Sequence, residues 1–329
     1  MFAIRRLLFP LACLFVLIAP STVGAVEKAG GSAAFDTPAG LVSWITDYRQ
    51  TPEPTRVPEA VQAMSRLGLF KDSQSAAFYI GFVAGVIGDN QVQAPKIIDD
   101  LFPLPPSEQA VVIKAIAYSG LPDWQDLLRQ FANHMPARKV LIRKYLFEDG
   151  KTLADVPLDN GNAVVDTLWG YYFATGSYDP VLRILEALRW TGEKADIKRQ
   201  VIGNMAMVTL ASNGARDENL LSLYHVQVPY QVASTRKPLQ RVVDAIETFE
   251  THKIRDEAQT AIQEARRRGP VKKPSNWAIA DKIGQTALSV GCVVAGALGH
   301  VEIAAPCVIT GALYSGVSNL ARVGSAANP

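Results

Sequence analysis

The sequence predicts an all-α protein, built as a multi-helix bundle or short α-solenoid with a two-fold internal repeat and a C-terminal helical hairpin. Two segments, residues 75–88 (SAAFYIGFVAGVIG) and 163–176 (AVVDTLWGYYFATG), are apolar around almost the whole helix circumference, which is typical of buried helices. Each ends at a glycine, a common helix terminator. Elsewhere apolar residues recur three or four positions apart, and no convincing alternation of apolar and polar residues predicts a strand.

Residues 1–25 have the features of a secretory signal peptide. Arg5 and Arg6 form a charged start, residues 7–18 form an apolar run, and residues 23–25 are small, as a cleavage site requires. The alternative, a membrane anchor, needs about 20 apolar residues to span a bilayer, and this run is shorter. We therefore expect an exported protein, periplasmic or secreted, with association to a membrane through its C-terminal end as the alternative.

The expected mature chain is electrically neutral. The whole chain has 33 Lys and Arg against 31 Asp and Glu, and removal of Arg5 and Arg6 leaves 31 of each sign. A general electrostatic attraction to nucleic acid is therefore not predicted.

Cleavage would also leave two cysteines, Cys292 and Cys307. In an oxidising compartment such a pair readily forms a disulfide. Closing a loop of this length stabilises a fold by about 3 kcal/mol in the chain-entropy model. The alternative is two buried free thiols.

A helical core is expected over residues 37–232, after a flexible leader at residues 26–36. Thr37 followed by Pro38 is typical of a helix start, with threonine as the cap and proline at the first helical position. The helices expected from apolar spacing and from glycine and proline positions cover residues 38–48, 59–67, 75–87, 107–119, 137–147, 163–175 and 193–212. Shorter ones begin near Pro95, Pro122, Pro180 and Leu220.

The internal repeat is predicted from the order of these helices. A buried helix, a short helix with an early proline, an apolar helix and a polar-faced helix follow each other twice, about 88–89 residues apart. Gly81 and Gly170, and likewise Gly88 and Gly176, are separated by this interval. The alternative is a chance recurrence of helix lengths. Between and after the two units, residues 153–158 are expected to be extended, and residues 226–232 are the best candidate for a strand.

Two further regions follow the core. Residues 233–276 are interpreted as one long helix over 238–268 and a basic linker, which either contacts anionic lipid or is simply a solvated helix end. Residues 277–329 are rich in Gly and Ala and predict a hairpin of two apolar helices, 286–299 and 303–317. This hairpin packs on the core, forms an oligomer interface or enters a membrane through residues 286–317.

Asp166, Trp169 and Tyr172 form the candidate binding site. Asp166 is the one carboxylate in a nearly all-apolar helix, so it needs a partner or a raised pKa. Trp169 lies on the same side of the helix, three positions on, and Tyr172 is a further candidate wall of a pocket. The alternative is an aromatic core with a carboxylate bonded to a neighbouring helix.

No catalytic residues, metal site or cofactor are expected. The four histidines are scattered, and no nucleophile elbow or phosphate-binding glycine loop is present. The sequence therefore favours a non-catalytic binding or scaffold protein of the cell envelope, acting with an envelope protein partner or by self-association. The alternatives are a membrane-associated or membrane-active protein acting through the hairpin and, second, an enzyme with a site between helices near Asp166.

Overall fold

The computed structural model describes residues 35–71, 76–148 and 150–268, and every regular element within these residues is a helix. The protein is therefore all-α, as the sequence predicts. The α-helices are α1 (Pro38–Asp47), α2 (Val57–Arg66), α3 (Ala76–Asp89), α4 (Ala94–Asp100), α5 (Ala110–Tyr118), α6 (Trp124–Phe131), α7 (Lys139–Phe147), α8 (Asn162–Thr175), α9 (Asp179–Ala187), α10 (Ile197–Gly214), α11 (Glu218–Gln227), α12 (Ala233–Glu247) and α13 (Thr251–Arg268).

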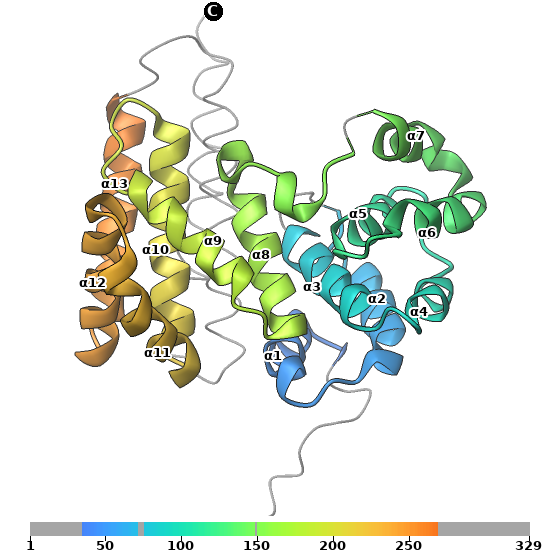
Figure 1. Cartoon of the computed structure of the whole chain (residues 1–329), viewed down its shortest axis with the longest axis horizontal. Coiled ribbons are helices and arrows are strands. Elements are labelled where there is room, and N and C mark those ends of the chain that lie inside the picture. The colour runs from blue at the N-terminus through green and yellow to red at the C-terminus, as the bar shows by residue number, and fades with distance from the viewer. Residues whose placement is uncertain (1–34, 72–75, 149, 269–329) are drawn as a thin grey trace, which may run out of the picture.

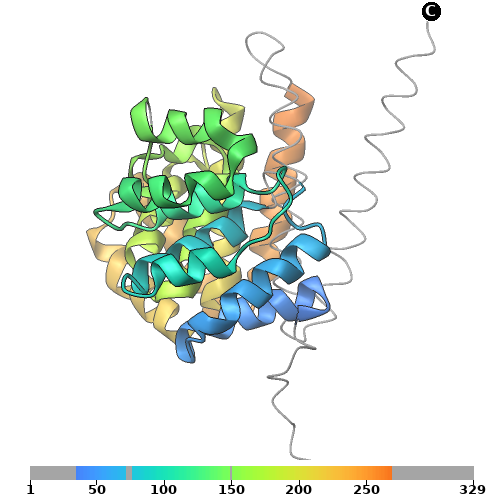
Figure 2. The ribbon, with the colours of Figure 1, turned by 90° about the vertical axis from the view of Figure 1, so that its right-hand side faces the viewer.

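Helices α3 and α8 lie side by side at the centre of the molecule (Figure 1). Helices α2 and α4–α7 lie on one side of this pair, and α9–α13 lie on the other (Figures 1 and 2). One continuous hydrophobic core joins both sides, from Phe35 before α1 to Ala258 in α13. The two apolar segments singled out in the sequence are thus the centre around which the shell of helices packs.

Glycines allow the backbones of α3 and α8 to touch. A Cβ atom at Gly81 would overlap the carbonyl oxygen of Thr167, and one at Gly170 would overlap that of Phe78. Gly81 faces Thr167, whereas four residues later Gly85 faces Ala174, so the contacts advance in the same direction along both helices. The two helices therefore run parallel and end at the same side of the molecule.

Local signals in the sequence place several helix ends correctly. The Thr37 hydroxyl accepts a hydrogen bond from the Gly40 amide at 3.1 Å, so Thr37 caps α1. Gly176 follows α8 in the left-handed conformation, with a φ of 71°. That conformation is strained for other residues, which explains why the helix stops at this glycine.

The prediction of a single long helix over residues 238–268 is wrong. The chain forms two helices, α12 and α13, that are separated at Thr248–Glu250. In a single helix, the spacing of apolar residues would place Phe249 on the buried face. In the structure it is 91% exposed and has a positive φ of 57°. The break reverses the chain, because α13 packs on both α12 and α10.

The two segments expected to be extended are also helical in part. Residues 226–232 contain the end of α11 and a 3-10 helix, η9 (Val228–Tyr230), rather than a strand. Residues 153–158 contain η6 (Leu153–Asp155) and the first residue of η7 (Leu158–Asn160). These short segments are wound in single turns, a scale at which periodicity in the sequence carries little information.

Several predictions concern residues outside the described ranges. The signal peptide (1–25), the hairpin (277–329) and the pairing of Cys292 with Cys307 belong to this group. Helices form in the order on which the internal repeat was predicted, and the repeat itself stays a prediction. Across residues 35–71, 76–148 and 150–268, none of the helices is both long and apolar enough to cross a membrane.

The contact between α3 and α8 predicts a large effect of one methyl group. Gly170→Ala would force the backbones apart, so we expect the free energy of unfolding to fall by at least about 2 kcal/mol in urea denaturation. Gly192→Ala is the matched control, since a Cβ there meets nothing within 4 Å. Equal stability of the two variants would contradict the proposed importance of this contact.

Candidate functional site

Asp166 is buried in α8, as its apolar surroundings in the sequence suggest. The residue is 6% exposed, and it forms no hydrogen bond or ion pair within the described residues. Burial disfavours the charged carboxylate and raises the pKa of Asp166 to about 7. The alternative of a carboxylate bonded to a neighbouring helix is not found within the described residues, and the buried carboxyl group is neutral below pH 7.

Trp169 lies three residues further along α8 and is 3% exposed. Its indole stacks on Phe173 at 6.0 Å between ring centroids, and it meets Tyr172 edge-on at 5.8 Å. The indole Nε1 is buried without a hydrogen-bond partner in the described part of the chain. Asp166 and Trp169 thus carry buried polar groups that the described structure leaves unsatisfied.

Tyr172 belongs to a different contact. Its hydroxyl donates to Asp217 at 2.7 Å, and Asp217 also forms an ion pair with Arg49 of η2 (Tyr48–Gln50). The guanidinium of Arg49 lies over the Tyr172 ring, 5.1 Å from its centroid. Asp217 in turn caps α11 by accepting from the Asn219 amide at 3.1 Å. These contacts connect η2 to α8 and to the start of α11.

The three predicted residues therefore do not form one site. Trp169 contacts Tyr172, but the hydroxyl of Tyr172 donates to Asp217, and Asp166 forms a hydrogen bond with neither Trp169 nor Tyr172. Two of the cavities that the described residues form have volumes of about 390 and 400 Å³, and none of the three residues lines either of them. Their role in binding stays a prediction.

A cavity that the sequence does not reveal lies where the 150–160 segment crosses α9. Arg183 holds this segment by donating to the carbonyl oxygens of Leu153 at 2.7 Å and Val156 at 2.8 Å. Arg199 of α10 holds it at a second point, through bonds of 2.7 and 3.2 Å to Asp159. The segment is thereby fixed above α9 and η8 (Leu188–Trp190), and space remains beneath it.

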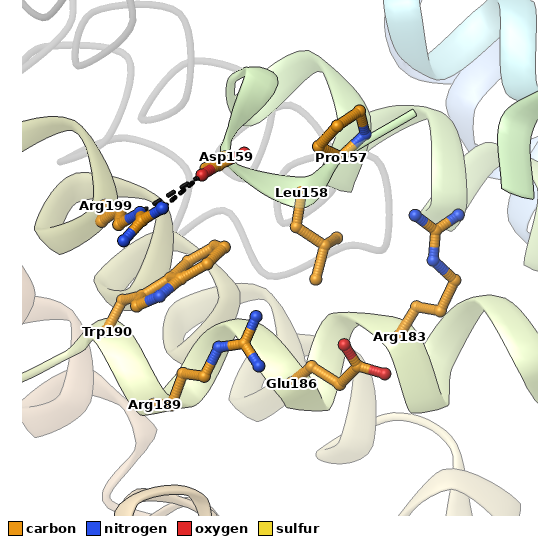
Figure 3. Close-up of a pocket in the computed structure, with 8 residues that line it drawn as sticks. All are labelled: Pro157, Leu158, Asp159, Arg183, Glu186, Arg189, Trp190 and Arg199. Atoms are coloured by element: carbon orange, nitrogen blue, oxygen red, sulfur yellow. Dashed lines mark hydrogen bonds and ion pairs between the residues drawn. The ribbon is translucent and has the colours of Figure 1, made fainter. Parts of the chain in front are cut away.

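This space, which we call the arginine cavity, has a volume of about 390 Å³. Figure 3 shows Leu158 entering it from the 150–160 segment, opposite Glu186 and Arg189. The residues that line it are Pro157, Leu158, Asp159, Arg183, Glu186, Arg189, Trp190 and Arg199.

Positive charge exceeds negative charge in the arginine cavity, with three guanidinium groups against two carboxylates. Trp190 is covered by two of them: the guanidinium carbons of Arg189 and Arg199 lie 4.9 and 5.6 Å from its ring centroid. Such cation–π contacts hold guanidinium groups in place. The pairing of Arg199 with Asp159 keeps the pKa of the Asp159 carboxyl below its usual value. Asp159 is therefore ionised and neutralises Arg199, so Arg183 and Arg189 have no ion-pair partner in the described part, and Arg183 already donates to two backbone carbonyls.

Sequence reasoning missed the arginine cavity because its residues look like the solvated face of an amphipathic helix. The only local signal is the pair Arg189-Trp190, which places a guanidinium beside a tryptophan that the structure buries to 8% exposure. The other arginines become part of the site only when the 150–160 segment folds back over α9.

Asp166 predicts a pH dependence of stability. Its pKa is raised in the folded protein, so the protein loses stability as the pH rises from about 4, where an unfolded aspartate ionises, to about 7, by about 4 kcal/mol in total, and the loss levels off at higher pH. Asp166→Asn cannot ionise, and we expect it to be more stable than the wild type at pH 8 but not at pH 4, as measured by urea unfolding. Asp100→Asn, on the exposed end of α4, is the control. An unchanged pH profile in Asp166→Asn would refute this assignment.

Tyr172 predicts a structural effect. Tyr172→Phe removes a hydrogen bond to an ionised carboxylate, and we expect the free energy of unfolding to fall by about 1–2 kcal/mol. Tyr178→Phe is matched to it, because the Tyr178 ring stacks on Tyr172 while its hydroxyl has no hydrogen bond within the described residues. Thermal unfolding of both variants separates the contribution of the hydroxyl from that of the ring.

Among the described residues no group of three or more His, Cys, Asp or Glu side chains is placed to hold a metal ion. Comparison of the chain with protein-family models, with curated proteins and with solved structures finds no match.

Proposed function

We propose that this chain is an exported, non-catalytic helical binding protein of the cell envelope, and that the arginine cavity binds a small oxyanion, a carboxylate or a phosphate ester. The observation that carries this proposal is the guanidinium of Arg189, which faces the cavity without a carboxylate partner in the described part of the chain.

The chemistry of the lining favours an anion. Arg199 is committed to Asp159, and the terminal nitrogens of Arg183 are committed to two backbone carbonyls. The donors of Arg189 remain for a ligand, and a guanidinium binds the two oxygens of a carboxylate or phosphate side by side. Trp190 and Leu158 add an apolar wall for the body of the ligand.

The same chemistry favours binding over catalysis. Arginine stays protonated in proteins, so guanidinium groups hold and orient an anion without accepting its proton. Export follows from the signal peptide expected at residues 1–25, and a disulfide between Cys292 and Cys307 belongs to the same proposal, as does an envelope protein partner or self-association.

Isothermal titration calorimetry with phenyl phosphate and benzoate tests the ligand class, with benzyl alcohol as the neutral comparison. We expect both anions to bind at low salt and the alcohol to bind at least tenfold more weakly. Arg189→Gln removes the unpaired charge, so it should weaken binding of the anions at least tenfold. Glu186→Gln removes the carboxylate of the cavity that holds no other part of its wall, and it should tighten binding because the net charge of the cavity rises by one.

Arg143→Gln is the matched control, since Arg143 is an exposed arginine on α7, outside the arginine cavity. It should bind the anions as the wild type does. The proposal is wrong if neither anion binds, or if Arg189→Gln and Arg143→Gln behave alike.

A further inference from the structure

A second cavity lies at the end of the molecule where the central helices α3 and α8 both stop. Its volume is about 400 Å³, and we call it the carboxylate cavity. It is lined by the ends of α3, α5 and α8, the start of α9, and part of the 150–160 segment. Its residues are Asp89, Tyr118, Gly120, Thr152, Leu153, Ala154, Leu168, Tyr171, Thr175, Ser177, Asp179, Pro180 and Arg183.

The parallel arrangement of α3 and α8 makes this cavity electronegative. Both helices point their C-terminal ends at it, and α5 ends beside it at Tyr118, whereas one N-terminal end, that of α9, lies there, so three negative helix ends meet one positive end. Helix C-termini carry unsatisfied carbonyl groups and a partial negative charge, which attracts cations.

Two carboxylates add full negative charges, against the one positive charge of Arg183. Asp89 is the last residue of α3, and Asp179 lies in the first turn of α9. Both act on the Tyr171 hydroxyl, whose pKa is raised first by burial and then by the charges of these two groups. Neither carboxylate forms a side-chain hydrogen bond or an ion pair within the described residues.

Asp89 is placed at a cost to stability. A negative charge at a helix C-terminus is unfavourable, and desolvation raises the pKa of the Asp89 carboxyl above its usual value. A residue that opposes the stability of its own helix while lining a cavity is typical of a binding position.

Two hydroxyl groups of the cavity, those of Tyr171 and Thr175, can accept hydrogen bonds from a ligand. The hydroxyl of Tyr171 donates to the carbonyl of Ser119 at 3.1 Å, and that of Thr175 donates to the carbonyl of Tyr171 at 3.0 Å, so the oxygen lone pairs of both stay available. The terminal nitrogens of Arg183 already donate to the 150–160 segment. Leu168 supplies apolar surface.

A ligand of this cavity must therefore bring positive charge, hydrogen-bond donors and an apolar body. A metal ion prefers a shell of several oxygen ligands, whereas part of this lining is apolar. We propose that the carboxylate cavity binds an organic ammonium ion, with its charged nitrogen between Asp89 and Asp179. This is a second site, and its charge is opposite to that of the arginine cavity.

Calorimetry with three ligands of one shape tests the proposal at pH 7.5: phenethylamine, 2-phenylethanol and 3-phenylpropionate, which are cationic, neutral and anionic. We expect the amine to bind this cavity at least tenfold more tightly than the alcohol. Asp89→Asn and Asp179→Asn should each weaken amine binding at least fivefold, and the double variant should abolish it. Asp100→Asn removes a carboxylate outside the cavity and should leave it unchanged.

Two further readouts separate a binding role from a structural one. Asp89→Asn should unfold at the same or a higher temperature than the wild type, because it removes an unfavourable charge from the end of α3. It should also bind phenyl phosphate as the wild type does, so failure of one site is distinguishable from failure of the other. The proposal is overturned if the amine does not bind, if the alcohol binds equally well, or if Asp89→Asn and Asp179→Asn bind the amine as Asp100→Asn does.

Discussion

Direct contact between the backbones of α3 and α8 is the constraint on which the rest of this structure depends. The carbonyl oxygens of Phe78 and Thr167 occupy space that a Cβ would need, so Gly81 and Gly170 are fixed by geometry rather than by local conformation. Two apolar helices joined in this way cannot shield their own outer faces. The other helices form the shell that covers them, and the continuous core is the result.

Because α3 and α8 run parallel, the chain between them must cross the molecule, and this connection forms part of both cavities. Parallel helices need a long connection, and the residues between α3 and α8 supply it as α4–α7 and the 150–160 segment. The connection returns across α9, where Arg183 binds it from below. Arg183 and the 150–160 segment that it holds both contribute to the walls of the two cavities. One of these cavities has an excess of positive charge and the other has an excess of negative charge.

Local sequence signals predicted the elements that depend on local physics. The apolar circumference of α3 and α8, the Thr37 cap and the stop at Gly176 each depend on a few neighbouring residues, and each is found. The break between α12 and α13 was missed because Phe249 continues the three-to-four spacing of apolar residues. Periodicity cannot reveal that this side chain is exposed and that its backbone has left the helix.

The two cavities could not be predicted from the sequence, because each brings together residues that are distant along the chain. Asp166 was singled out because its apolar neighbours are adjacent in sequence, and its burial follows from them. Asp217 forms an ion pair with Arg49, 168 positions away, and Arg199 finds Asp159 40 positions away. Before folding, each of these charges is indistinguishable from a solvated surface group. Within the described residues, Arg189 in one cavity and Asp89 with Asp179 in the other have no ion-pair partner in the folded chain, and we propose that ligands supply the opposite charge.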